Sequence, residues 1–81
     1  MKFTAFITVG LKDDMLDPEA NTMLETLHNE GFQAETLKVE QKFTVTFQAP
    51  SKKKACTQAN SMCEHLLANP DLQKYELEVM G

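Results

Sequence analysis

Residues 1–20, MKFTAFITVGLKDDMLDPEA, contain the transition that decides the fold, because a strand pattern changes there into a helix start. The first half alternates between apolar and mostly polar side chains, and its apolar set is Phe3, Ala5, Ile7 and Val9. This period of two is typical of a strand with one buried face. In the second half, Asp17 suits a helix N-cap and Pro18 suits the first helical position. We therefore expect residues 12–16 to form an exposed loop.

The remaining elements follow from the same two periodicities. A helix from Pro18 to about Gly31 has the apolar positions Ala20, Met23, Leu24 and Leu27. Strands are predicted over 35–40 and 43–48, and EQK at residues 40–42 is interpreted as the tight connection of a hairpin. Ser51 can cap a second helix, whose apolar set is Ala55, Ala59, Met62, Cys63, Leu66 and Leu67. Asn69 and Pro70 end that helix, and a last strand surrounds Leu77 and Val79.

This order, β-α-β-β-α-β, predicts a single α+β domain over residues 1–81. The pattern commonly builds a ferredoxin-like, two-layer sandwich, in which an antiparallel sheet carries both helices on one face. The other face is expected to carry the residues Thr4, Phe6, Thr8, Thr36, Lys38, Thr44, Thr46, Glu76 and Glu78. A chain this short has a thin core, so we expect part of this face, or a sheet edge, to be buried against a second copy.

Composition disfavours several classes of function. The 81 residues carry eight basic and twelve acidic side chains, which gives a net charge of −4. All the basic residues are lysine, and an acidic chain without arginine is poorly suited to grip nucleic acid. No apolar run approaches the roughly 18 residues of a membrane span, and residues 1–10 read as a strand and not as a signal peptide. We therefore expect a protein that binds neither nucleic acid nor membrane.

The two cysteines, Cys56 and Cys63, are interpreted as reduced thiols with small, buried side chains. On one helix they would lie about 10 Å apart, which is beyond the roughly 7 Å that a disulfide allows between Cα atoms. Reduced thiols predict a cytoplasmic location.

No catalytic or metal site is apparent. The aspartates of residues 11–17 lack the spacing of a calcium loop, and His28 and His65 stand alone on separate helices. Residues 51–54, SKKK, place three lysines at a helix start, where they form a solvated basic patch, a surface for an acidic partner or an anion site. The residues thus indicate a domain that works by association.

Two stretches carry a resemblance to a known family. VGLKDDMLDPEA at residues 9–20 and MCEHLLANPDLQKYELE at residues 62–78 resemble the two signatures of the PurS family, the small subunits of phosphoribosylformylglycinamidine synthase. The second signature is carried by Met62, Cys63, Leu66, Leu67, Ala68, Asn69, Pro70 and Tyr75. The chain departs from the family pattern at Ala20 and Gln41, where glycine is usual.

The resemblance implies a non-catalytic subunit that forms dimers or tetramers. It would bridge a large ATP-dependent synthetase subunit and a glutaminase subunit, so that ammonia passes between them in de novo purine (IMP) biosynthesis. ATP, magnesium and glutamine would be used by the whole complex, and this chain would bind no cofactor. Dimers of such subunits can also exchange a segment, which here would pivot near Gly10. The interface residues expected are Lys12, Asp13, Asp14, Met15, Leu16, Asn69, Pro70 and Tyr75.

Two alternatives stay open at this point. A dimeric regulatory module with the same element order would sense a small metabolite, such as an amino acid, and ligand binding would raise its stability. A small stand-alone enzyme would need convergent titratable groups, and the spacing of such groups along the chain indicates none.

Overall fold

The computed structural model describes all residues from 1 to 81 and contains three strands and two helices. The elements are β1 (Lys2–Leu11), α1 (Pro18–Asn29), β2 (Glu40–Gln48), α2 (Lys52–Met62), a π-helical turn η1 (Cys63–Leu67) and β3 (Gln73–Met80). β1 lies in the middle of one antiparallel sheet, with β2 and β3 at its edges. The predicted α+β, ferredoxin-like class is confirmed.

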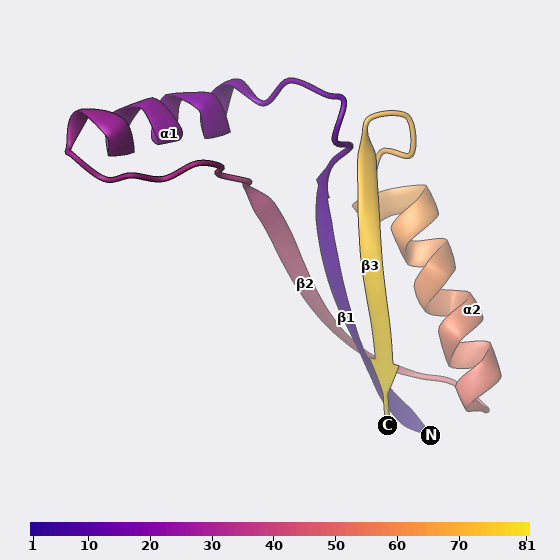
Figure 1. Cartoon of the computed structure of the whole chain (residues 1–81). Helices are drawn as coiled ribbons and strands as arrows, with labels where there is room; N and C mark the ends of the chain where they lie inside the picture. Colours follow the sequence, from indigo (N-terminus) through magenta and orange to yellow (C-terminus); the bar gives the residue numbers. More distant parts are fainter.

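The core lies between the sheet and α2, which runs along β3 and β1 (Figure 1). The inward side chains of β1 are at most 1% exposed, and they are Phe3, Ala5, Ile7 and Val9. Ala55, Ala59 and Cys63 face them from α2 and η1 with no exposed surface. Because these helical residues are small, the helix backbone can approach the sheet closely.

The predicted hairpin at residues 40–42 is wrong. These residues lie inside β2, where Glu40 pairs with Gly10 and Gln41 pairs with Val9, and residues 32–39 form no strand. The apolar positions Leu37, Val39, Phe43, Val45 and Phe47 keep one alternating phase across EQK. That stretch also has no glycine, asparagine or proline to turn the chain, so it runs straight into β2.

The first helix does not cover the face on which it was expected. α1 lies beyond the end of the strands and is directed away from α2 (Figure 1), and Ala20 is its one buried residue. The molecule is consequently elongated, with principal extents of 52 × 24 × 14 Å. We call residues 12–39 the arm; it consists of a loop, α1 and an extended return segment. An amphipathic pattern predicts a helix, but it does not specify which surface the helix packs against.

Two residues of the second helix differ from expectation. Cys63 is buried as predicted, but Cys56 is exposed. Leu66 is 84% exposed, although helical spacing placed it in the core. The N–H of Ala68 donates to the carbonyl oxygen of Cys63 at 2.9 Å, which closes the wider ring of a π turn and shifts Leu66 out of the apolar stripe.

The sheet face opposite α2 carries no helix. Thr4, Phe6 and Thr8 are half-buried along its centre, and the ammonium nitrogen of Lys42 lies 5.8 Å from the centroid of the Phe6 ring. Thr36 and Lys38, which were expected on this face, lie in the arm instead, because their segment does not join the sheet.

Candidate interaction surface at the arm end of the sheet

Two loops meet at the end of the sheet from which the arm leaves. The backbone N–H of Lys12 donates to the carbonyl oxygen of Leu72 at 3.0 Å and so joins the loop after β1 to the loop before β3. The second loop is braced by Asn69, whose carbonyl oxygen accepts from the N–H of Gln73 at 2.7 Å. The Asn69 side chain also accepts from the N–H of Asp71 at 3.1 Å. The two predicted interface segments therefore form one continuous end of the molecule.

Most predicted interface residues on this end are open to solvent. Leu16 is 85% exposed, and the neighbouring Leu72, which was not among the predicted residues, is 45% exposed. The other exposed members are Asp13, Asp14, Asn69 and Pro70, whereas Lys12 and Met15 are half-buried. An end that combines exposed leucines with charged groups is suited to contact another protein.

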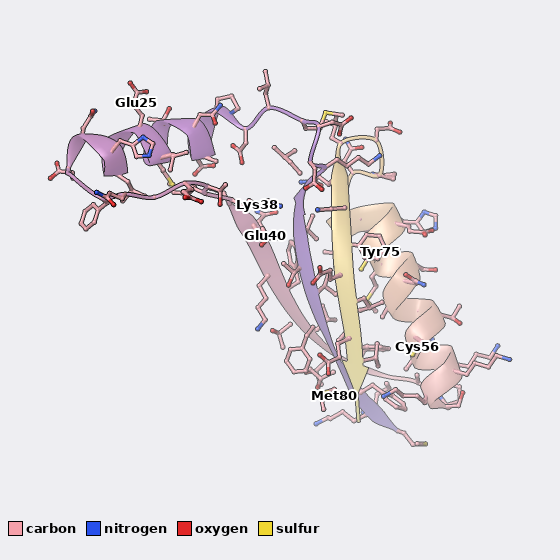
Figure 2. All side chains as sticks on the ribbon, viewed as in Figure 1. Glu25, Lys38, Glu40, Cys56, Tyr75 and Met80 are labelled. Carbon is pink, nitrogen blue, oxygen red and sulfur yellow. The ribbon has the colours of Figure 1, made fainter.

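Tyr75 is the predicted interface residue with the most internal contacts. Its half-buried side chain packs against the core, and Figure 2 shows it between β3 and the second helix. Its hydroxyl donates to Oδ1 of Asn60 at 2.8 Å and lies 3.3 Å from Oε1 of Glu64. Desolvation by burial and the nearby Glu64 carboxylate raise the pKa of the Tyr75 hydroxyl. These contacts give Tyr75 a role in joining β3 to the helix.

Asp13 holds the two ion pairs of the protein. Its Oδ1 accepts from Nζ of Lys74, on β3, at 2.9 Å and from Nζ of Lys38, in the return segment, at 3.3 Å. The hydrogen bond from Lys74, followed by that from Lys38, lowers the pKa of Asp13 below its ordinary value. The same bond to Asp13 raises the pKa of Lys74. Three segments that are distant in sequence thus meet at one carboxylate.

A cleft of about 370 Å³ lies between the arm and the end of the sheet. Met15, Leu16, Leu37 and Val39 supply apolar walls, and Asp13, Lys38 and Lys74 also line it. Sequence reasoning identified the loop but missed Lys38 and Lys74. No local signal could have found them, because they are 25 and 61 positions from Asp13 in the chain.

The arrangement offers contact surface and no grouping of reactive side chains. Nowhere do three or more histidine, cysteine or acidic side chains gather closely enough to hold a metal ion. Nε2 of His28 donates to the carbonyl oxygen of Ala34 at 2.6 Å, so this histidine fastens the turn that follows α1. Neither helix is long and apolar enough to cross a bilayer.

Comparison with known proteins agrees with this picture. The family profile "PurS: Phosphoribosylformylglycinamidine (FGAM) synthase" matches residues 4–81. A phosphoribosylformylglycinamidine synthase subunit PurS from Archaeoglobus fulgidus is 36% identical over 77 residues, which cover 90% of this chain and 92% of the relative. The corresponding subunit from Methanothermobacter thermautotrophicus is 30% identical over 79 residues, covering 98% and 94%.

The backbone also matches solved structures over nearly its full length. A chain in the structure of PurLQS from Thermotoga maritima superimposes with a TM-score of 0.89 at 26% identity, and the match covers 99% of each chain. Bacillus subtilis PurS gives a TM-score of 0.88 at 25% identity, with 98% of this chain and 99% of that chain covered. The projecting arm is included in matches of this extent.

Proposed function

This chain belongs to the PurS family of phosphoribosylformylglycinamidine synthase subunits, and from that premise we propose that it bridges the two catalytic subunits of the synthase. One partner is the ATP-dependent synthetase subunit, and the other is the glutaminase subunit. The bridge holds them so that ammonia released from glutamine reaches the activated amide in purine biosynthesis. ATP, magnesium and glutamine are used by the larger subunits, and this chain supplies no catalytic group.

The observation that carries the proposal is the match to a PurLQS assembly. The whole chain superimposes on a chain of that structure with a TM-score of 0.89. An intact match, arm included, supports assembly with PurL-type and PurQ-type partners more strongly than a match of the sheet alone would. The comparisons do not favour the metabolite-sensing alternative.

Exposed apolar surface supports self-association as part of the same function. Met23 is 45% exposed on α1, and Phe32 is 61% exposed just after it. On the sheet, Phe43 and Val45 of β2 are only half-buried, because α1 does not cover them. A homodimer in which the arm of each copy packs on the other copy covers both surfaces, and its two-fold symmetry repeats the contact. The reduced Cys56 and Cys63 agree with a cytoplasmic location.

The end of the sheet that carries Lys12 is the surface we assign to the larger subunits. Lys12→Glu reverses one charge there, and it should reduce recovery of both larger subunits in a pull-down with the tagged chain. Lys53→Glu is the matched control, because it makes the same charge change on α2 near the opposite end of the sheet (Figure 1). Circular dichroism should show both variants folded. Recovery that is equal for the two variants contradicts the assignment of this surface.

The bridging role itself is tested by the unmodified chain. Mixed with the synthetase and glutaminase subunits of its own organism, it should co-elute with both in gel filtration and restore glutamine-dependent activity. Failure to bind either subunit in the presence of glutamine and nucleotide would overturn the proposed function.

A further inference from the structure

The arm is joined to the rest of the molecule almost entirely at its base. It leaves the sheet after β1 and returns at β2, at the level where Gly10 pairs with both Glu40 and Lys74. Beyond that level α1 buries one residue, Ala20, which lines the cleft at the base. Apart from this contact at the base, no extensive packing against the sheet or α2 holds α1 in its direction (Figure 1).

Asp13 lies where the two limbs of the arm meet the sheet. Asp13 itself belongs to the outgoing limb of the arm, which is the loop between β1 and α1. Lys38 belongs to the return limb, which is the extended segment between α1 and β2, and Lys74 belongs to β3. The pair with Lys38 joins the limbs to each other, and the pair with Lys74 joins them to the sheet. One backbone bond, from Lys12 to Leu72, reinforces the outgoing limb.

We propose that Asp13 is the positioning residue that fixes the direction in which the arm projects, and that it thereby presents the arm to a second copy of this chain. Exposed ion pairs are individually weak. Within one chain, however, no extensive packing competes with these pairs, so weak ties at the base are sufficient to restrict the arm before a second copy packs on it. The consequence for self-association rests on the proposed function, whereas the restriction of the arm does not.

The neighbouring aspartates do not share this role. Asp14 is exposed and makes no ion pair, and Asp17 caps α1 by accepting from the N–H of Ala20 at 3.2 Å. Asp14→Asn is consequently a matched control for Asp13→Asn: the two variants lose the same charge in the same loop, one position apart.

The direction of the arm can be measured as a distance between two spin labels. Cys56 is an exposed native attachment point on α2, and Glu25→Cys provides a second one on α1; Figure 2 shows both positions well separated. Cys63 is buried and stays unlabelled. The chains are diluted until they elute as monomers, so that the distances are measured within one chain and no second copy holds the arm.

We expect a narrow distance distribution for the parent chain and for Asp14→Asn, and a distribution at least twice as wide for Asp13→Asn. Sodium chloride at about 1 M should widen the parent distribution too, because screening is then effective within about 3 Å. The charge-swapped chain Asp13→Lys, Lys38→Asp, Lys74→Asp should restore the narrow distribution. Equal widths for Asp13→Asn and Asp14→Asn, or no restoration in the swapped chain, would overturn the inference.

A pull-down with the parent chain, taken together with the distance widths, separates this inference from the proposed function. A parent chain that binds both larger subunits, with widths unchanged in Asp13→Asn, overturns the role of Asp13 and leaves the bridging function standing. A parent chain that binds neither subunit, with the expected change in width, overturns the bridging function and supports the role of Asp13 in directing the arm.

Discussion

Leu66 and Leu67 are adjacent in sequence, yet the side chain of Leu66 is 84% exposed whereas Leu67 packs against the core. Both belong to η1, the π-helical turn that ends the second helix. The wider turn changes the angle between successive residues and so decides which leucine faces the sheet. Single π turns of this kind are frequent at functional sites. This one places an apolar side chain in solvent just before the loop of the candidate surface.

The leucine pair gives a direct test of the π turn. Leu67→Ala should lower the free energy of unfolding by about 1–2 kcal/mol, less than the ~2–5 kcal/mol of a fully buried leucine, because Leu67 is only half-buried. Leu66→Ala should change it by less than about 0.5 kcal/mol, as exposed substitutions usually do. Urea denaturation of both variants measures the difference. A larger loss in Leu66→Ala would show that a regular α-helical turn is present in solution.

The N-caps of the two helices should differ in their effect on stability. Asp17 accepts from the N–H of Ala20, and Ser51 accepts from the N–H of Lys54, both at 3.2 Å. Replacing either cap by alanine costs its helix about 1 kcal/mol. Because α2 packs in the core, Ser51→Ala should lower global stability by about that amount in urea denaturation.

Asp17→Ala should act locally in the monomer, since α1 makes no extensive contact with another element of its own chain. Hydrogen exchange should speed up for the amides of α1 and stay unchanged for those of β1. A global loss in the Asp17→Ala monomer equal to that in Ser51→Ala would mean that α1 packs on its own sheet.

The close approach of α2 to the sheet depends on alanine. Ala59 has no exposed surface and belongs to the main core cluster with Ile7 and Val9. Ala59→Leu adds three carbon atoms where no space exists, and we expect a loss of about 1–3 kcal/mol in the free energy of unfolding. Gln58→Leu, one position earlier on the exposed side of α2, should stay within about 0.5 kcal/mol. A neutral Ala59→Leu would indicate that α2 can move away from the sheet without cost.

Local chemistry predicted the elements of this fold well. The alternation of residues 3–9 gave β1, and the caps Asp17 and Ser51 began both helices where expected. These signals depend on neighbours within a few positions, so they can be read from the chain alone. The position of α1 depends on which surface buries its apolar side chains. A single sequence does not specify that surface, and the expected placement over the sheet was wrong.

The candidate surface was predicted only in part, because some of its contacts join residues that are distant in sequence. Lys12 and the following loop stood out by composition, and Asn69 and Pro70 by their place after a helix; whether they bind the larger subunits stays a prediction. Lys38 and Lys74 carry no distinguishing local pattern, and only the folded chain brings them to Asp13. The error at residues 40–42 had a different cause, because the unbroken phase of alternation through Gln41 was visible in the sequence.

The ion pairs of Asp13 predict that their contribution to stability stays constant between an acidic and a basic limit of pH. The pKa of Asp13 is lowered in the folded chain. Its ion pairs therefore contribute to stability above the ordinary pKa of about 3.9, and this contribution is lost as the pH falls through the lower pKa of the folded state. The pKa of Lys74 is raised in the folded chain. Its ion pair therefore contributes to stability below a pH of about 10.4, and this contribution is lost as the pH rises through the higher pKa of the folded state.

Lys74→Gln removes the largest cause of the lowered Asp13 pKa, so NMR titration of the Asp13 carboxyl carbon should show this pKa rising toward the ordinary value. Lys53→Gln removes a distant lysine and should leave that titration unchanged. An Asp13 titration that is the same in both variants would mean that the pair with Lys74 does not persist in solution.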